Sequence, residues 1–267
     1  MDIKVETMDA GRLVLNADFK EILAFNGIDS FDKLWNIPSE PVKKVLKQRG
    51  TERVFLKTPD GILLEAYIKR YRPEPFKEKL KNLLALRPAR YPGALNEWNA
   101  IIEFHRKGLP TMMPAAYASG GGDSCLLTLA IRDYVRASEL FAGLAGGDRD
   151  RRRKIIRKIA ELAAGMHSAG LAHQDFYLVH MFVRKDEDDK VYLIDLQRTV
   201  FSQDFSERWR VKDLAQLLFS SRKFASRTDI MFFWKIYSAG AGGRMLKDGS
   251  LIRKICRKAE RIGRHAG

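Results

Sequence analysis

The 267-residue sequence lacks the features that mark secreted, membrane-spanning and disordered proteins. Its two cysteines, Cys125 and Cys256, lie far apart in mostly apolar or helical surroundings, as expected for reduced thiols in a cytosolic protein. No apolar window approaches the roughly 18 residues of a membrane span. The start, Met1–Glu6, has no basic segment followed by an apolar run, and no repeat or low-complexity tract is visible. We therefore expect a cytoplasmic globular protein with one two-lobed unit or two small domains.

Acidic residues are also scarce, because 33 Asp and Glu stand against 48 Lys and Arg, for a net charge of +15. This charge predicts an anionic partner: nucleic acid, an anionic membrane surface, or an acidic substrate or protein. Two predicted helices hold the densest basic runs, which are Arg149, Arg151, Arg152, Arg153, Lys154, Arg157 and Lys158, and Arg253, Lys254, Arg257, Lys258, Arg261 and Arg264. The runs lack interleaved aromatics, so no nucleic acid is expected. Each cation near an anionic leaflet contributes roughly 1 kcal/mol, which favours a membrane surface.

Two short apolar runs, 181–184 and 191–194, are separated by residues that are nearly all charged, and this pattern predicts a β-hairpin. A hairpin returns its second strand to the start of the first. We therefore expect Asp195 to come close to the loop that carries Asp175 and His180. One or two carboxylates, together with substrate phosphates, are the usual protein ligands of Mg²⁺. The pattern thus predicts a phosphoryl-transfer site.

These residues also carry a resemblance. His173-Gln174-Asp175, then His180, a hairpin and Ile194-Asp195-Leu196 resemble the catalytic loop and metal-binding turn of the protein-kinase-like fold. More narrowly, HQDFYLVHMF, followed by IDLQR and ERWRVKDLAQLLFSS, resembles the bacterial lipopolysaccharide core kinases, which phosphorylate heptose in the inner core. The resemblance covers about residues 43–224, and its second half is the more specific.

The resemblance implies an α+β, two-lobed, protein-kinase-like fold. Residues 1–130 are then the small nucleotide-binding lobe, an antiparallel sheet with one key helix, to which residues 17–37 add a helical segment. Residues 131–267 are the larger, mainly helical lobe for catalysis and acceptor binding. Only about fourteen residues separate Leu196 from Val211, and so short an activation segment favours a compact or lipid-linked acceptor over an extended peptide.

In the first lobe, the segment that ends at Lys69 resembles the kinase strand whose lysine holds the α- and β-phosphates of ATP. Glu97, on a helix that stops near residues 108–110, is the expected partner of this lysine, with Glu103 as the second choice. Gly50, the single glycine of segment 47–53, is expected to help cover the phosphates.

Adenine is expected near residues 128–131, beside Thr128 and Ile131, where backbone groups would hold it.

In the second lobe, the resemblance implies that Asp175 is the catalytic residue and that Asp195 binds the metal. His180 stands where protein kinases have a metal-ligating asparagine. Imidazole is a poor Mg²⁺ ligand, so three roles stay open for His180: weak binding of a second metal, binding of phosphate, or shaping of the loop.

His173 and Asp213 are expected to give structural support. Asp213, on the helix-like segment 210–218, resembles the buried kinase aspartate that hydrogen-bonds the catalytic-loop backbone. Gln174 replaces a common arginine, so control through a phosphorylated activation loop is not expected.

We therefore predict an ATP-dependent kinase that uses Mg²⁺ or Mn²⁺ and phosphorylates a sugar hydroxyl of the lipopolysaccharide core at the cytoplasmic face of the inner membrane. A lipopolysaccharide core or similar anionic acceptor and an anionic membrane surface are its expected partners, with an acidic protein as a further candidate. The alternatives are a kinase of another sugar, of an aminoglycoside-like small molecule or of a protein, and an inactive kinase-like binding module.

Overall fold

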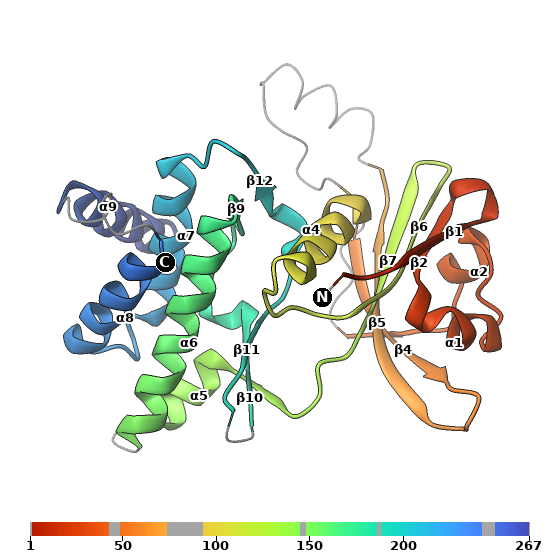
Figure 1. The fold of residues 1–267 in the computed structure, drawn as a ribbon, viewed down its shortest axis with the longest axis horizontal. Coiled ribbons are helices and arrows are strands. Elements are labelled where there is room, and N and C mark those ends of the chain that lie inside the picture. The colour runs from red at the N-terminus through yellow and green to blue at the C-terminus, as the bar shows by residue number, and fades with distance from the viewer. Residues whose placement is uncertain are drawn as a thin grey trace. The chain divides into compact units, whose positions relative to one another are not determined.

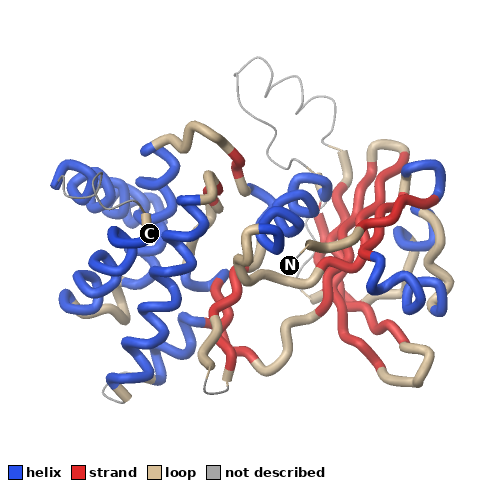
Figure 2. Tube along the Cα trace, viewed as in Figure 1, coloured by secondary structure: helices blue, strands red, loops and turns tan. Residues whose placement is uncertain are grey.

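The computed structural model describes residues 2–42, 49–73, 93–144, 148–185, 188–241 and 249–266. The chain divides into two compact units (Figure 1). Unit 1 comprises Met1–Arg106 and Met112–Ile131, and unit 2 comprises Lys107–Thr111 and Arg132–Gly267. Strands concentrate in unit 1, whereas helices make up most of unit 2 (Figure 2). This composition agrees with the predicted α+β, protein-kinase-like fold.

Unit 1 is built on a seven-stranded antiparallel sheet in the order β1-β2-β6-β7-β5-β4-β3. The strands are β1 Val5–Met8, β2 Leu13–Asn16, β3 Glu40–Pro41, β4 Arg49–Lys57, β5 Leu63–Tyr71, β6 Pro114–Gly120 and β7 Asp123–Leu129. Strands β4 and β5 form a hairpin. The Thr58 hydroxyl accepts a hydrogen bond from the Ile62 amide (2.9 Å), and Gly61 has the positive φ of 89° that the turn requires.

The helices of unit 1 pack on this sheet. They are α1 Lys20–Phe25, α2 Phe31–Trp35 and α4 Ala94–Arg106, with 3-10 turns η1 Asp9–Gly11 and η2 Ala17–Phe19. Leu23, Leu34, Leu56 and Ile68 are fully buried in the core. A Cβ atom at Gly120 would lie 2.9 Å from the Phe31 ring, so only glycine lets α2 approach β6 this closely.

Unit 2 is a helical body with two small sheets. Its helices are α5 Ala137–Gly143, α6 Arg149–Ser168, α7 Glu207–Ser221, α8 Arg227–Gly240 and α9 Gly249–Ala266, and α6 packs on α8 while α7 packs on α9 (Figure 1). Strands β8 Tyr134–Arg136, β10 Met181–Arg184 and β11 Val191–Leu193 form one sheet, and β9 Leu171–Ala172 and β12 Val200–Phe201 form the other. The turns η3 Leu178–His180 and η4 Leu196–Arg198 flank the β10–β11 hairpin.

Helices α6 and α8 of unit 2 begin at side-chain caps. The Asp148 side chain accepts hydrogen bonds from the Asp150 and Arg151 amides at the start of α6, and Ser226 and Asp229 form a capping box on α8. After α6 the chain turns at Gly170, where φ is 75° and a Cβ atom would lie 2.3 Å from the Ser202 carbonyl oxygen. Glycine therefore brings β9 against β12, just before the loop that carries Asp175.

Candidate active site

Two aspartates of unit 2 flank the β10–β11 hairpin in the sequence, and its pairing brings the segments that carry them close together. Asp175 lies in the loop between β9 and η3, and Asp195 follows β11 by two residues. The Ile194 amide donates to the His180 carbonyl oxygen (3.0 Å), and His173 Nε2 donates to the Ile194 carbonyl oxygen (3.0 Å). The convergence that the sequence pattern predicted is therefore present.

Asp195 itself and Gln174, the residue before Asp175, have left-handed backbone conformations that non-glycine residues rarely adopt. Asp195 has φ 62° and ψ 56°, and Gln174, immediately before Asp175, has φ 69°. Left-handed backbone of this kind costs on the order of 1–3 kcal/mol at a non-glycine residue and persists where the surrounding structure enforces it. Such positions concentrate at functional sites, which is consistent with the roles predicted for the two carboxylates.

Helix α7 holds the loop around Asp175 through a buried carboxylate. Asp213 is fully buried (0% exposed), and its two oxygens accept from the backbone amides of His173 (2.7 Å) and Gln174 (2.8 Å). Bonds from backbone amides to a charged acceptor are among the stronger hydrogen bonds in proteins. Asp213 thus makes the contact that the resemblance implied for it.

Two more polar residues on the same face of α7 continue this brace. Gln216 accepts from the Phe176 amide (3.0 Å) and donates to the Gln174 carbonyl (2.9 Å), and the Ser220 hydroxyl accepts from the Leu178 amide (3.0 Å). Gln216 and Ser220 lie three and seven residues after Asp213, so the three side chains point the same way from the helix. The loop from residue 173 to residue 178 is therefore bonded to α7 along its length.

The two histidines of this loop have defined tautomers. His173 Nε2 donates to a carbonyl, and its Nδ1 accepts from the Asp175 amide (3.2 Å), so the ring is neutral. Burial lowers the pKa of His173 below 6.5, which favours the same neutral form. His180 Nδ1 lies 2.7 Å from the Asp175 carbonyl oxygen, which only accepts, so this nitrogen carries a proton. His180 thus helps to shape the loop.

The site can accommodate a hard divalent cation. His180 Nε2 lies 3.8 Å from Asp195 Oδ2, a spacing at which one cation is able to contact both atoms. Within the described ranges, no group of three or more His, Cys, Asp and Glu side chains forms a self-sufficient metal site. Mg²⁺ is typically held by one or two carboxylates together with substrate phosphates, so Asp195 fits a metal that arrives with a nucleotide.

A buried relay of side chains supports Asp213 from behind. Arg210 donates to the Tyr237 oxygen, the Tyr237 hydroxyl donates to His167 Nδ1 (2.7 Å), and His167 Nε2 donates to Asp213 (3.3 Å). Burial raises the pKa of Tyr237 to about 12, and burial also lowers the pKa of His167. The relay therefore links α8 and α6, through neutral rings, to the loop that carries Asp175.

Two cations lie beside the Asp175 carboxylate. Arg198 Nη1 is 3.2 Å from both of its oxygens, and Lys212 Nζ donates to the Gln174 side chain (3.0 Å). Sequence reasoning assigned no role to Arg198, Lys212, Gln216, Ser220 or Tyr237. For Gln216 and Ser220, a usable signal was their spacing on the face of α7 that also carries Asp213.

The predicted lysine–glutamate pair lies within unit 1. Lys69 Nζ on β5 is 2.5 Å from Glu97 Oε1 on α4, and the Tyr71 hydroxyl donates to Glu97 Oε2 (2.8 Å). Glu97 is fully buried (0% exposed), so its carboxylate depends on these two donors. Glu103, the second choice, pairs with Arg106 instead (2.6 Å).

The other residues proposed for the nucleotide are placed as follows. Thr128 is buried near the end of β7, and Ile131 is the last residue of unit 1. Gly50 lies inside β4, where it pairs with Arg70 of β5, so residues 49–53 of the segment expected to cover the phosphates form a strand and not a loop. These residues are extended because β5 offers a partner as far as Tyr71. Lys47 and Gln48, at the start of segment 47–53, lie outside the described residues.

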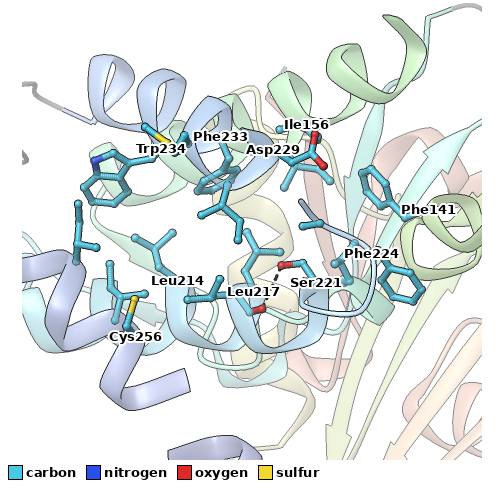
Figure 3. Close-up of a pocket in the computed structure, with 18 of the residues that line it drawn as sticks. Phe141, Ile156, Leu214, Leu217, Ser221, Phe224, Asp229, Phe233, Trp234 and Cys256 are labelled. Carbon is cyan, nitrogen blue, oxygen red and sulfur yellow. Dashed lines mark hydrogen bonds between the residues drawn. The ribbon is translucent and has the colours of Figure 1, made fainter. Parts of the chain in front are cut away.

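Unit 2 also contains an apolar pocket of about 300 Å³ between α6, α7, α8 and α9 (Figure 3). Its walls include Leu217, Phe233 and Trp234. The charged residues that line it, Arg152 and Asp229, pair with each other (2.7 Å). Its size lies at the lower end of the range for ligand pockets.

The two units contain a buried lysine–glutamate pair on a sheet and a helix-braced loop with converging carboxylates. Together these features define a kinase-like phosphotransferase. The sequence profile of the lipopolysaccharide kinase (Kdo/WaaP) family matches residues 32–237.

Individual relatives agree with this match. A lipopolysaccharide core heptose(I) kinase WaaP from Escherichia coli is 31% identical over 253 residues, covering 88% of this chain and 95% of the relative. The WaaP of Pseudomonas aeruginosa is 30% identical over 267 residues, covering 94% and 96%. A solved structure, WaaP in complex with acyl carrier protein, has a TM-score of 0.70 and 27% identity, covering 94% of this chain and 98% of that chain. This chain therefore belongs to the lipopolysaccharide kinase (Kdo/WaaP) family, and the predicted family and enzyme class are confirmed.

Proposed function

We propose that this protein uses ATP and a divalent metal to phosphorylate a heptose hydroxyl of the lipopolysaccharide inner core. The observation that carries the proposal is the convergence of Asp175 and Asp195 in one braced site, in a chain of the lipopolysaccharide kinase family. Curated relatives that this chain matches over most of its length are core heptose(I) kinases, which supports heptose as the acceptor sugar.

In the proposed mechanism, Lys69 donates hydrogen bonds to the α- and β-phosphates, and Glu97 keeps its amine in position. Asp195, with His180 beside it, would hold the metal, and the metal would supply positive charge to the phosphates. Asp175 orients the acceptor hydroxyl and takes its proton late in an in-line transfer. The new bond joins the hydroxyl oxygen to the γ-phosphorus, while the bond from phosphorus to the β–γ bridging oxygen breaks and ADP leaves.

The test is a transfer assay with labelled ATP, Mg²⁺ or Mn²⁺, and core lipopolysaccharide that lacks phosphate, with the label located by mass spectrometry. We expect one phosphate on a heptose hydroxyl. Asp175→Asn should abolish transfer while calorimetry finds nucleotide affinity nearly unchanged. Asp204→Asn, a change at an exposed aspartate of unit 2, is the matched control. Label on another class of acceptor, or turnover by Asp175→Asn, would contradict the proposal.

The basic helices contribute differently to partner binding. Within unit 2, Arg151 and Lys154 of α6 contact Asp189 (3.0 and 3.5 Å), Arg152 pairs with Asp229, and Arg153 and Arg157 lie over the Phe232 ring. Much of the basic run on α6 therefore makes contacts within unit 2 that stabilise its fold. Helix α9 buries Leu251, Ile255 and Ala259, whereas its exposed basic residues are Arg253, Lys254, Arg257, Arg261 and Arg264.

We infer that α9 is the face for anionic partners. At the cytoplasmic side of the inner membrane it would meet anionic lipid. No helix in the described ranges combines the length and hydropathy that crossing a bilayer requires. Binding to vesicles with anionic lipid, weakened by added salt, is the expected result. Charge reversal at Arg253 and Arg257 should reduce binding, whereas Lys4→Glu in unit 1 should not; equal binding to neutral vesicles would contradict this proposal.

We also propose that an acyl carrier protein binds unit 2 and places its acyl chain in the apolar pocket. A solved WaaP is complexed with such a protein. The pocket is apolar and shares Ile252, Ile255 and Cys256 with α9, and its lining residue Met231 is 66% exposed. An acylated carrier should raise the thermal midpoint of this protein more than the carrier without a chain, and Leu217→Arg should remove the difference. Equal stabilisation by both carriers would refute use of the pocket.

A further inference from the structure

Arg198 contacts the proposed catalytic carboxylate and has no role in the mechanism above. It is the last residue of η4 and lies three residues after Asp195. Its Nη1 atom is equidistant, at 3.2 Å, from Oδ1 and Oδ2 of Asp175. The Arg198 side chain is 50% exposed, against 21% for Asp175. A long cationic side chain with this exposure is able to change partners at little cost, because exposed ion pairs contribute little to stability.

The position of Asp175 does not depend on Arg198. The Asp175 amide donates to His173 Nδ1 (3.2 Å), and its carbonyl oxygen accepts from His180 Nδ1 (2.7 Å). An acceptor hydroxyl that bonds to Asp175 competes with Arg198 for the same two oxygens. Binding of the acceptor is therefore able to displace the guanidinium from these oxygens.

The displaced guanidinium stays close to a second cation. Lys212, which contacts Gln174, has a pKa lowered first by burial and then by the charge of Arg198, while Asp175 opposes both. The carboxylate of Asp175 is thus bordered by positive charge on η4 and α7. Positive charge accelerates a reaction where it stabilises negative charge in the transition state. In phosphoryl transfer that negative charge lies on the oxygens of the transferring phosphoryl group.

We propose that Arg198 is a catalytic residue that leaves Asp175 when the acceptor binds and donates hydrogen bonds to the non-bridging oxygens of the transferring phosphoryl group. The proposal rests on the kinase function above. Guanidinium suits this task because its N–H groups form a planar fork that matches phosphate oxygens. Lys212 remains with Gln174 and supplies background charge.

The position of Arg198 on the chain supports this assignment. Asp195 and Arg198 occupy one 3-10 turn that begins in the left-handed conformation of Asp195. Arg198 follows Asp195 in this turn and contacts Asp175. A phosphoryl group held between the two aspartates is therefore within reach of the Arg198 side chain. The bonds made and broken are those of the proposed transfer, and Arg198 neither gains nor loses a proton.

The test compares wild type with Arg198→Ala and Arg198→Lys. Arg208→Ala, which removes an exposed arginine on α7, is the control. Calorimetry first measures affinity for Mg·ADP alone, then with aluminium fluoride, which imitates the phosphoryl group in flight. Affinity for Mg·ADP should be the same in all four proteins. Aluminium fluoride should tighten binding in wild type and in Arg208→Ala, but hardly in Arg198→Ala.

Kinetics provide the second readout. Arg198→Ala should lower kcat by roughly 10²–10³, the effect of removing one donor from a developing anion, with KM for ATP within about twofold of wild type. Arg198→Lys should recover part of the loss. Full tightening by aluminium fluoride in Arg198→Ala, or a raised KM for the acceptor with unchanged kcat, would overturn the assignment.

Failure of the proposed acceptor is recognisable separately. Suppose that the wild-type protein hydrolyses ATP, or binds Mg·ADP more tightly with aluminium fluoride, yet never labels lipopolysaccharide. That result refutes the proposed acceptor, while the comparison of Arg198→Ala with wild type still decides the role of Arg198. A wild-type protein that fails to bind Mg·ADP overturns both proposals.

Discussion

Asp213→Asn tests whether the charge of one buried side chain fixes the conformation of loop 173–178, which carries Asp175. The carboxylate accepts from the amides of His173 and Gln174 and from His167 Nε2. An asparagine of the same shape keeps one acceptor oxygen, and its NH₂ group must face another donor. Losing one bond to a charged acceptor costs about 1.5–3 kcal/mol, and leaving one buried donor unpaired costs about 1–3 kcal/mol. The sum, about 2.5–6 kcal/mol, is a large part of the roughly 5–15 kcal/mol that stabilises a typical domain.

We expect this loss to appear locally before it appears globally. Amide hydrogen exchange, read by mass spectrometry over residues 171–178, should accelerate in Asp213→Asn by a factor that corresponds to several kcal/mol. Turnover should fall about 100-fold, because a shift of about 1 Å in a catalytic group has that effect. KM for ATP should stay near the wild-type value. Asp204→Asn is again the control. Unchanged exchange together with unchanged kcat would show that the loop does not depend on the Asp213 charge.

Two further predictions concern the nucleotide pair and the buried histidines. Glu97→Gln should weaken binding of metal-nucleotide measured by calorimetry, because it leaves the Lys69 amine without its buried counter-charge; undiminished affinity would argue against Lys69 as the phosphate ligand. The pKa values of His167 and His173 are lowered by burial from 6.5, so the unfolded chain binds more protons below pH 6.5. Stability should be complete above pH 6.5 and fall on acidification, by up to about 1.4 kcal/mol per pH unit for each histidine. Thermal midpoints between pH 8 and pH 5 measure this loss, His265→Gln should retain it, and a flat profile would contradict it.

The active-site hairpin could be predicted because its signals are local. Two apolar runs with charged residues between them define the strands, and pairing of Met181 with Leu193 then follows from the hairpin itself. Glu97 could be chosen because it lies on an amphipathic helix ahead of a clear stop. The resemblance supplied the roles, which neither periodicity nor composition contains.

Other parts depend on long-range contacts that leave no local trace. Strands β1 and β2 extend the sheet only because Leu13–Leu15 pairs with residues 116–118, a hundred positions away. Segment 47–53, with its single glycine Gly50, was expected to cover the phosphates, but residues 49–53 pair with β5 as a strand, and no local feature of the sequence indicates that pairing. The Arg198 contact with Asp175 and the chain from Tyr237 to Asp213 join residues far apart in the sequence, so no spacing rule could indicate them.

Helix α7 presents two different faces to its surroundings. One face bonds to the loop backbone through Asp213, Gln216 and Ser220, while Leu214, Leu217 and Leu218 line the apolar pocket. A rigid rod cannot rotate at one face without rotating at the other. A molecule that fills the cavity and shifts α7 is therefore expected to shift the loop of Asp175 as well, so an inhibitor bound there would act without competing with ATP.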